Sequence, residues 1–249
     1  MMALPFGLSP AAAAFLAAAV FAAAFVRGYS GFGFSALVVA AAALVANPLQ
    51  FVAVATVWEM LMSVQAWRGV WRDVDWQRVG LLSGGAAIGL PLGLWALTSV
   101  AEDAARAAIS AYVLLMCAVL IAGWRMRGEA GRGATAAVGV VSGVANAPGM
   151  GGLPVAAFFA AQPMRAQVFR ATLVAYFPLL DLYSAPLYWW HGLITWGTGV
   201  AVVAGLPLVL AGNWLGGRHF FHTDPQEFRR FAILLLAALS ALGLLKSVM

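Results

Sequence analysis

The chain has 249 residues, of which 63% are hydrophobic and only 9% are charged. Soluble domains carry about 25% charged residues, so this composition excludes an ordinary water-soluble protein. The net charge of +5 does not indicate a nucleic-acid-binding protein, because the basic residues stand singly between apolar stretches and form no basic face. The single cysteine, Cys117, excludes a disulfide framework within the chain.

Apolar runs predict ten membrane spans. In chain order they cover about residues 8–27, 31–46, 50–67, 77–98, 105–124, 134–147, 150–161, 165–190, 193–215 and 229–247. The residues before the first run include no Lys or Arg, so we interpret that run as a retained span rather than a signal peptide. The second and seventh spans are short. These runs predict an all-α polytopic membrane protein with a first transmembrane repeat at 1–124, a cytoplasmic connector at 125–133 and a second repeat at 134–249.

The basic residues predict the orientation of these spans. If all ten spans cross, Arg106 and Lys246 fall on one side and every other basic residue falls on the opposite side. Basic loops prefer the cytoplasmic face, so both termini should be external in a multi-pass protein of the inner (plasma) membrane. The residues on the predicted cytoplasmic side are Arg27, Arg68, Arg72, Arg78, Arg125, Arg127, Arg132, Arg165, Arg170, Arg218, Arg229 and Arg230.

The two halves share short matches in the same order. These are Asn47-Pro48 with Gln162-Pro163, Ala55-Thr56 with Ala171-Thr172, and Gly89 and Gly93 with Gly212 and Gly216. Because each half has an odd number of spans, two related halves must be inverted relative to each other in the membrane. We interpret the glycine pairs, with their four-residue spacing, as positions of close helix packing.

Each half has a Gly-rich break where its first span meets its short second span, at residues 28–35 and 146–152. Glycines allow positive φ, and unwound backbone at membrane depth lines a cavity or is buried in protein. A helix that restarts after such a break directs free N–H groups there, which favours an anion. The alternative is that the glycines only allow a tight turn or close packing. The predicted substrate-binding residues at the breaks are Ser30, Gly31, Gly33, Ser35, Asn146, Gly149, Gly151 and Gly152.

Two acidic residues, Glu59 and Asp181, fall inside predicted spans, where an ionised carboxylate costs at least about 2.5 kcal/mol. They either carry protons during transport, or pair with arginines or backbone donors, or lie near a polar helix end. Thr56 and Thr172 could donate hydrogen bonds to an oxyanion, although threonine in a membrane helix also bonds to its own backbone. Arg170 and Arg27, which stands just before the first break, could attract or neutralise an anion or serve as orientation signals.

An enzymatic function has one motif in its favour. Gly28-Tyr29-Ser30-Gly31 fits the pattern around the nucleophile of rhomboid-like intramembrane proteases, but a serine nucleophile needs a base, and no histidine is clearly placed at mid-membrane. A P-loop is missing from the sequence, so direct use of ATP is not expected. The short cluster His219, His222 and Asp224 is better explained as a solvated loop than as a metal site. We therefore expect no enzyme, no metal and no cofactor.

Taken in order, these motifs resemble the sulfite exporter TauE/SafE family over nearly the whole length. The resemblance rests on Gly31-Phe32-Gly33 with Gly149-Met150-Gly151-Gly152, on Pro48 with Pro163, and on Ala55-Thr56 with Ala171-Thr172. Phe34-Ser35 departs from the family's pattern, which often continues with Gly, and Val57 and Leu173 stand where Ser is usual. The resemblance implies transport, usually outward, of sulfite or of organosulfonates such as sulfoacetate.

We therefore expect a secondary exporter of a small sulfur-containing anion that works by alternating access, with Glu59 and Asp181 as candidates for proton coupling. A passive anion channel is the alternative of a different class, because the same helix breaks could build one without coupling acids. The expected partners are the small anion and the lipid bilayer, without nucleic acid. The sequence is also compatible with a homodimer.

Overall fold

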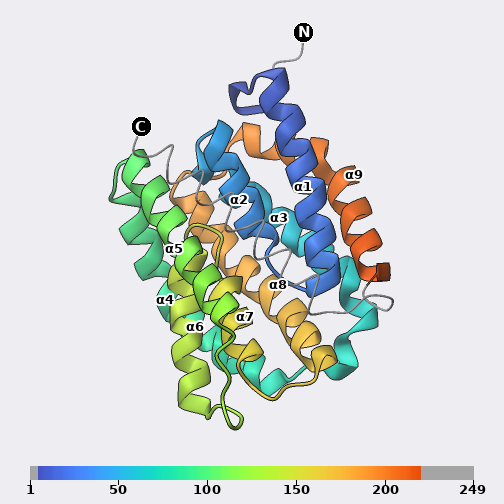
Figure 1. Cartoon of the computed structure of the whole chain (residues 1–249). Coiled ribbons are helices and arrows are strands. Elements are labelled where there is room, and N and C mark those ends of the chain that lie inside the picture. The colour runs from blue at the N-terminus through green and yellow to red at the C-terminus, as the bar shows by residue number, and fades with distance from the viewer. Residues whose placement is uncertain (1–4, 220–249) are drawn as a thin grey trace.

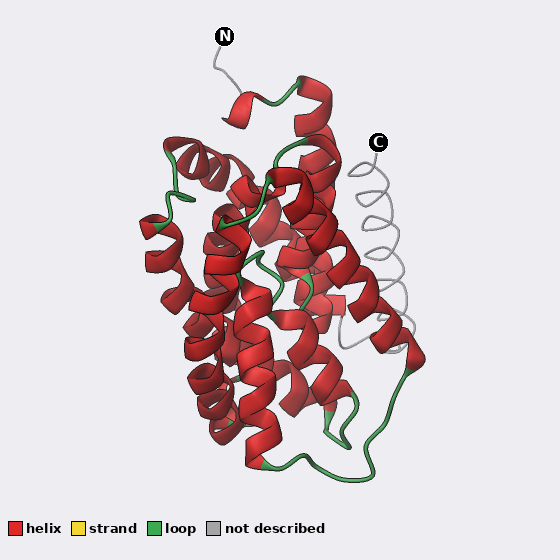
Figure 2. Ribbon diagram, turned by 90° about the vertical axis from the view of Figure 1, so that its left-hand side faces the viewer, coloured by secondary structure: helices red, strands yellow, loops and turns green. Residues whose placement is uncertain are grey.

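A computed structural model describes residues 5–219, and all regular structure in this range is helical (Figures 1 and 2). The nine α-helices of the described range coincide with the first nine predicted spans, and the tenth, at 229–247, lies outside it. They are α1 (Pro10–Ser30), α2 (Phe34–Val45), α3 (Pro48–Ala66), α4 (Trp76–Thr98), α5 (Glu102–Ala122), α6 (Arg132–Asn146), α7 (Gly152–Ala160), α8 (Ala166–Trp190) and α9 (Trp196–His219).

Local capping signals set several helix starts. Ser9 accepts a hydrogen bond from the backbone of α1, and Asn47 accepts one from the backbone of α3. In both helices a proline, Pro10 or Pro48, occupies the first position, where its missing N–H is not needed. Pro163, matched to Pro48 in the sequence, lies instead before α8, which begins at Ala166. The two matched prolines therefore occupy different places relative to their helices.

Four helices, α1, α3, α4 and α9, are long and apolar enough to cross a membrane. In contrast, α2, α6 and α7 have 12, 15 and 9 residues. At about 1.5 Å per residue they measure roughly 18, 22 and 14 Å, less than a hydrocarbon core of about 30 Å. The predicted short spans are therefore too short to cross such a core.

The short helices belong to two helical hairpins, α1–α2 and α6–α7. The backbone N–H of Met126, before α6, donates to the carbonyl of Ala161, after α7, at 2.6 Å. At the other hairpin, Phe6 before α1 packs on Phe51 in the first turn of α3, with ring centroids 5.3 Å apart. Each hairpin thus returns to the end of the molecule from which it came.

Arg27 and Arg170 are among the arginines of the predicted cytoplasmic side that lie within helices. Arg27 is in the last turn of α1 and is 2% exposed, and Arg170 lies in the second turn of α8. The predicted first span ended at Arg27 on the cytoplasmic side, whereas α1 continues to Ser30 and Arg27 is buried inside the protein.

The helices pack in a regular pattern. α1 lies along α9, α4 lies along α6, and α3 packs against α8 between these pairs (Figure 1). Glycines allow the close approach: a Cβ on Gly216 would overlap the carbonyl oxygen of Phe25 on α1, and one on Gly89 would overlap that of Val140 on α6. The predicted packing role of these glycines is confirmed.

Candidate anion-binding site

The two Gly-rich breaks line one small buried cavity. It has room for about one water molecule. Glu59 enters from α3 and Phe177 from α8. The remaining lining residues come from the two hairpins and are Gly33, Ser35, Ala36, Asn146, Gly149, Met150, Gly152 and Leu153.

Glycine is required at the breaks for two different reasons. Gly31, Gly33 and Gly149 have φ values of 84°, 89° and 76°, in the left-handed region that disfavours a side chain. Gly152 has a helical backbone, but a Cβ there would lie 2.8 Å from the ring of Phe177. The glycines thus let α2 and α7 begin inside the protein, where their first N–H groups have no partner within the helix.

A buried ion pair stands beside the cavity. The Nε of Arg27 lies 3.5 Å from Oε1 of Glu59, and the Nη2 of Arg27 donates to the hydroxyl of Ser63 at 2.7 Å. The guanidinium also lies 5.8 Å from the ring centroid of Phe177. Ser35, in the first turn of α2, lies beside the Glu59 carboxylate. The positive end of α2 and the guanidinium of Arg27 therefore converge on one carboxylate.

Asp181 lies within electrostatic reach of both Arg27 and Glu59. It is 2% exposed, and its Oδ2 has no hydrogen-bond partner among the described residues. An unpaired charge in such a place is costly, so two carboxyl groups depend on one neighbouring guanidinium.

A second set of polar side chains ties the α6–α7 hairpin to α8. The hydroxyl of Tyr188 donates to the carbonyl of Asn146. The Oγ of Ser142 donates to the carbonyl of Gly151 at 2.6 Å and lies 2.7 Å from the hydroxyl of Tyr176. These contacts hold the second break in place against α8.

Sequence reasoning missed these tyrosines, as well as Ser142, Met150 and Phe177. Part of the signal was present in the spacing of Phe177, Asp181, Ser184 and Tyr188. Separations of three and four residues place them on one face of α8. Reading α8 as an apolar run concealed this polar face.

Six of the predicted substrate-binding residues do not line the cavity, and four of them have side chains that bond elsewhere. Ser30 donates to the carbonyl of Val26 at 2.8 Å, and Thr56 donates to that of Val52 at 3.0 Å, so both bond to their own helix. The remaining two contact other segments: Thr172 accepts from the backbone N–H of Asp75 at 3.1 Å, and Arg170 donates to the carbonyl of Gly28 at 2.9 Å. Gly31 and Gly151 also lie outside the lining.

The described residues do not support the hypothesis of a serine protease or that of a metal site. None of the hydrogen bonds of Ser30 in the range 5–219 involves a histidine. Within that range, no group of three His, Cys, Asp or Glu side chains could hold a metal ion. His222 and Asp224 lie outside it.

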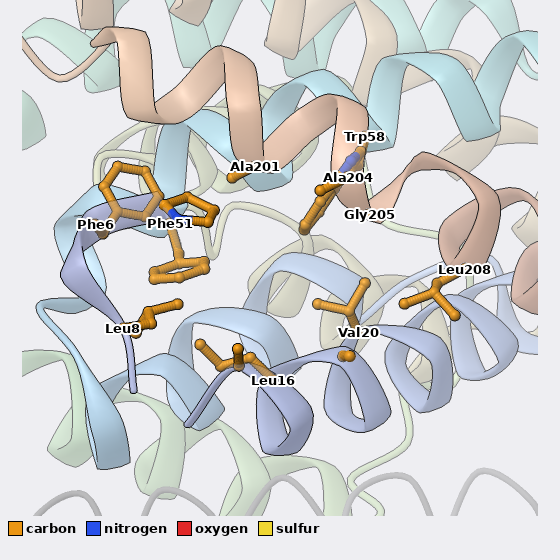
Figure 3. Close-up of a pocket in the computed structure, with 13 residues that line it drawn as sticks. Phe6, Leu8, Leu16, Val20, Phe51, Trp58, Ala201, Ala204, Gly205 and Leu208 are labelled. Atoms are coloured by element: carbon orange, nitrogen blue, oxygen red, sulfur yellow. The ribbon is translucent and has the colours of Figure 1, made fainter. Parts of the chain in front are cut away.

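An apolar pocket of about 610 Å³ lies between α1, α3 and α9 (Figure 3). Apart from Trp58, its labelled side chains, such as Phe6, Leu16 and Leu208, are hydrocarbon. The one polar side-chain group, the indole N–H of Trp58, donates to the carbonyl of Val202 at 3.1 Å. An oxyanion placed there would lose its water without gaining hydrogen bonds, so the polar cavity is the better anion site.

Comparison with known families adds to this geometry. The family described as Sulfite exporter TauE/SafE matches residues 16–243, a range that includes both breaks. The chain belongs to the TauE/SafE family. The resemblance inferred from the sequence is thereby confirmed, and with the apolar helices it indicates a multi-pass membrane transport protein. The curated proteins and the solved structures contain no match to this TauE/SafE chain.

Proposed function

We propose that this TauE/SafE protein exports a small sulfur-containing oxyanion, such as sulfite or an organosulfonate, by alternating access. The observation that carries the proposal is the single buried cavity bounded by both Gly-rich breaks, with Arg27 and the first turn of α2 beside it. Positive charge and free N–H groups suit an anion. The family's description supplies sulfite as the substrate class.

The packing of the helices supports two inverted repeats. In two repeats of five helices, α6 corresponds to α1 and α9 corresponds to α4. The repeat then relates the observed packing of α1 on α9 to the observed packing of α6 on α4. In the same scheme, α3 and α8 correspond to each other and meet in the centre (Figure 1). Movement of one half against the other around a central site is the usual route to alternating access.

A polar cluster joins several segments at the connector end. Arg78, in the first turn of α4, donates to Gln162 at 2.9 Å and to Glu129 at 2.8 Å, and it lies 3.0 Å from a carboxylate oxygen of Asp75. It thereby ties α4 to the connector and to the α7–α8 loop. We assign this end to the cytoplasm and place the termini outside. Opening toward the cytoplasm then requires the cluster to rearrange.

A coupled carrier is favoured over a passive channel by the tightness of the cavity. A pore must let an anion pass continuously, whereas this cavity has room for about one water molecule. Glu59 and Asp181 are the candidates for carrying protons, because Glu59 lines the cavity and Asp181 lies within electrostatic reach of Glu59. Neither is exposed.

The test is flux through purified protein in proteoliposomes loaded with sulfite or a sulfonate. A pH gradient should drive uphill anion movement, and Glu59→Gln or Asp181→Asn should abolish the dependence of the flux on the pH gradient. The control Asp73→Asn removes an exposed carboxylate and should retain that dependence. Flux independent of the gradient would overturn proton coupling and favour the channel. Absence of any flux would overturn the transport proposal.

A further inference from the structure

The Glu59 carboxylate lies where a bound anion would be expected. It lines the cavity, it lies beside Ser35 in the first turn of α2, and Arg27 approaches it to 3.5 Å. A guanidinium and the N-terminus of a helix are the two groups that most often receive an oxyanion in proteins. With Glu59 ionised, both are already engaged by the protein's own carboxylate.

We propose that Glu59 is an internal substitute for the transported anion, and that substrate gains Arg27 and the N-terminus of α2 only when Glu59 takes up a proton. The inference rests on the proposed function and adds the order of events at its site. In the empty protein the carboxylate of Glu59 compensates the guanidinium. When substrate enters, the anion takes over that compensation and Glu59 is neutral.

The surrounding charges support an exchange of this kind. From α1, Arg27 faces Glu59, and from α8, Asp181 and Tyr188 lie within its electrostatic reach. Arg170, also on α8, interacts with Arg27 and holds the carbonyl of Gly28. The helix α2 contains no titratable residue, and α9 contains them only in its last turn.

Two carboxyl groups thus share the guanidinium of Arg27, and the guanidinium of Arg170 interacts with that of Arg27. An additional anion would be uncompensated unless one carboxyl became neutral, and uncompensated charge in a buried site is costly. A second observation agrees with this. The Oδ2 of Asp181 has no hydrogen-bond partner among the described residues, so it is available to accept a proton or a hydrogen bond. The site can therefore accept an anion and a proton together.

Proton-linked binding has a definite pH signature. If one proton enters with each anion, affinity rises by about tenfold for each unit by which the pH falls, over the range in which Glu59 is ionised in the empty protein. In Glu59→Gln the side chain is always neutral, so binding should be independent of pH. Its affinity at neutral pH should match the value that the wild type reaches only in acid.

The experiment uses the purified full-length protein and methanesulfonate, because this anion keeps the same charge throughout the pH range. Binding is measured by titration calorimetry for wild type, Glu59→Gln and the exposed control Asp73→Asn. We expect a pH-dependent affinity for wild type and the control and a flat profile for Glu59→Gln. A wild-type slope retained in Glu59→Gln, or loss of binding by this variant in a folded state, would overturn the inference.

A second measurement needs no variant. Calorimetry of the wild type in buffers of different ionisation enthalpy counts the protons taken up with each anion, and we expect about one. A count of zero, or wild-type binding that does not change with pH, overturns the inference and leaves the proposed function intact. If neither methanesulfonate nor sulfite binds the wild type at any pH, the proposed function fails together with it.

Discussion

Removing both partners of the buried pair Arg27–Glu59 should destabilise the protein by less than the sum of the two single losses. Arg27→Met retains the apolar stem, but it leaves the Glu59 carboxylate and the Ser63 hydroxyl without the guanidinium. A buried ion pair broken on one side costs about 3–5 kcal/mol, and a hydrogen bond to a charged group contributes about 1.5–3 kcal/mol within that loss. We therefore expect Arg27→Met to lower the free energy of unfolding by about 3–5 kcal/mol.

The double variant Arg27→Met, Glu59→Met provides the decisive comparison. It leaves no uncompensated charge, so its loss should fall short of the sum of the two single losses by about 2–3 kcal/mol. The assay is reversible unfolding of the purified protein in mixed detergent micelles, followed by circular dichroism. Arg218→Met, at an exposed arginine over the ring of Trp214, should cost no more than about 1 kcal/mol.

Additive losses in this cycle would refute the reasoning. They would mean that Arg27 and Glu59 contribute independently of each other, and the 3.5 Å approach would then have no energetic consequence. A loss for Arg27→Met no larger than that for Arg218→Met would refute it as well.

Three further predictions concern packing, the break and the topology. In α4, Gly89→Ala should lower stability by about 1–3 kcal/mol in thermal unfolding, because its Cβ would overlap a carbonyl of α6, whereas Gly84→Ala, in open space, should be neutral or slightly stabilising. Gly33→Ala should cost about 1–2 kcal/mol through its positive φ and reduce flux, and Gly33→Asn, which tolerates that φ better, should recover part of both. In a background without Cys117, the cysteine of Asn47→Cys should react with a membrane-impermeant thiol reagent added outside. The cysteine of Gln162→Cys should react only when the reagent is added on the cytoplasmic side. Labelling of both cysteines from one side would contradict the proposed topology.

Much of the fold could be predicted because its signals are local. Each apolar run became a helix in the described range, and Ser9 and Asn47 begin α1 and α3 through contacts within a few residues. The breaks were predictable for the same reason, since Gly33 and Gly149 adopt the positive φ that their glycine content indicated. Their meeting in one cavity was expected only from the resemblance between the halves.

The contacts of the polar residues were less predictable because they depend on how each helix is rotated about its axis. Thr56 and Thr172 look equivalent in the sequence, yet Thr56 bonds to its own helix and Thr172 contacts the backbone that precedes α4. Residue type and spacing along one helix do not specify which neighbouring helix a side chain will face.

By itself the sequence determined a helical membrane protein and the positions of its two Gly-rich breaks. It also showed that two acidic residues, Glu59 and Asp181, lie within spans, where a negative charge needs a partner. Only the tertiary structure decided how Glu59 is compensated. Arg27 and Glu59 are separated by a turn, the whole of α2 and half of α3, and their pairing depends on the depth at which α1 ends and on the angle at which α3 packs. Long-range packing sets these quantities, and it places the carboxylate of Glu59 where the sequence had led us to expect a bound anion.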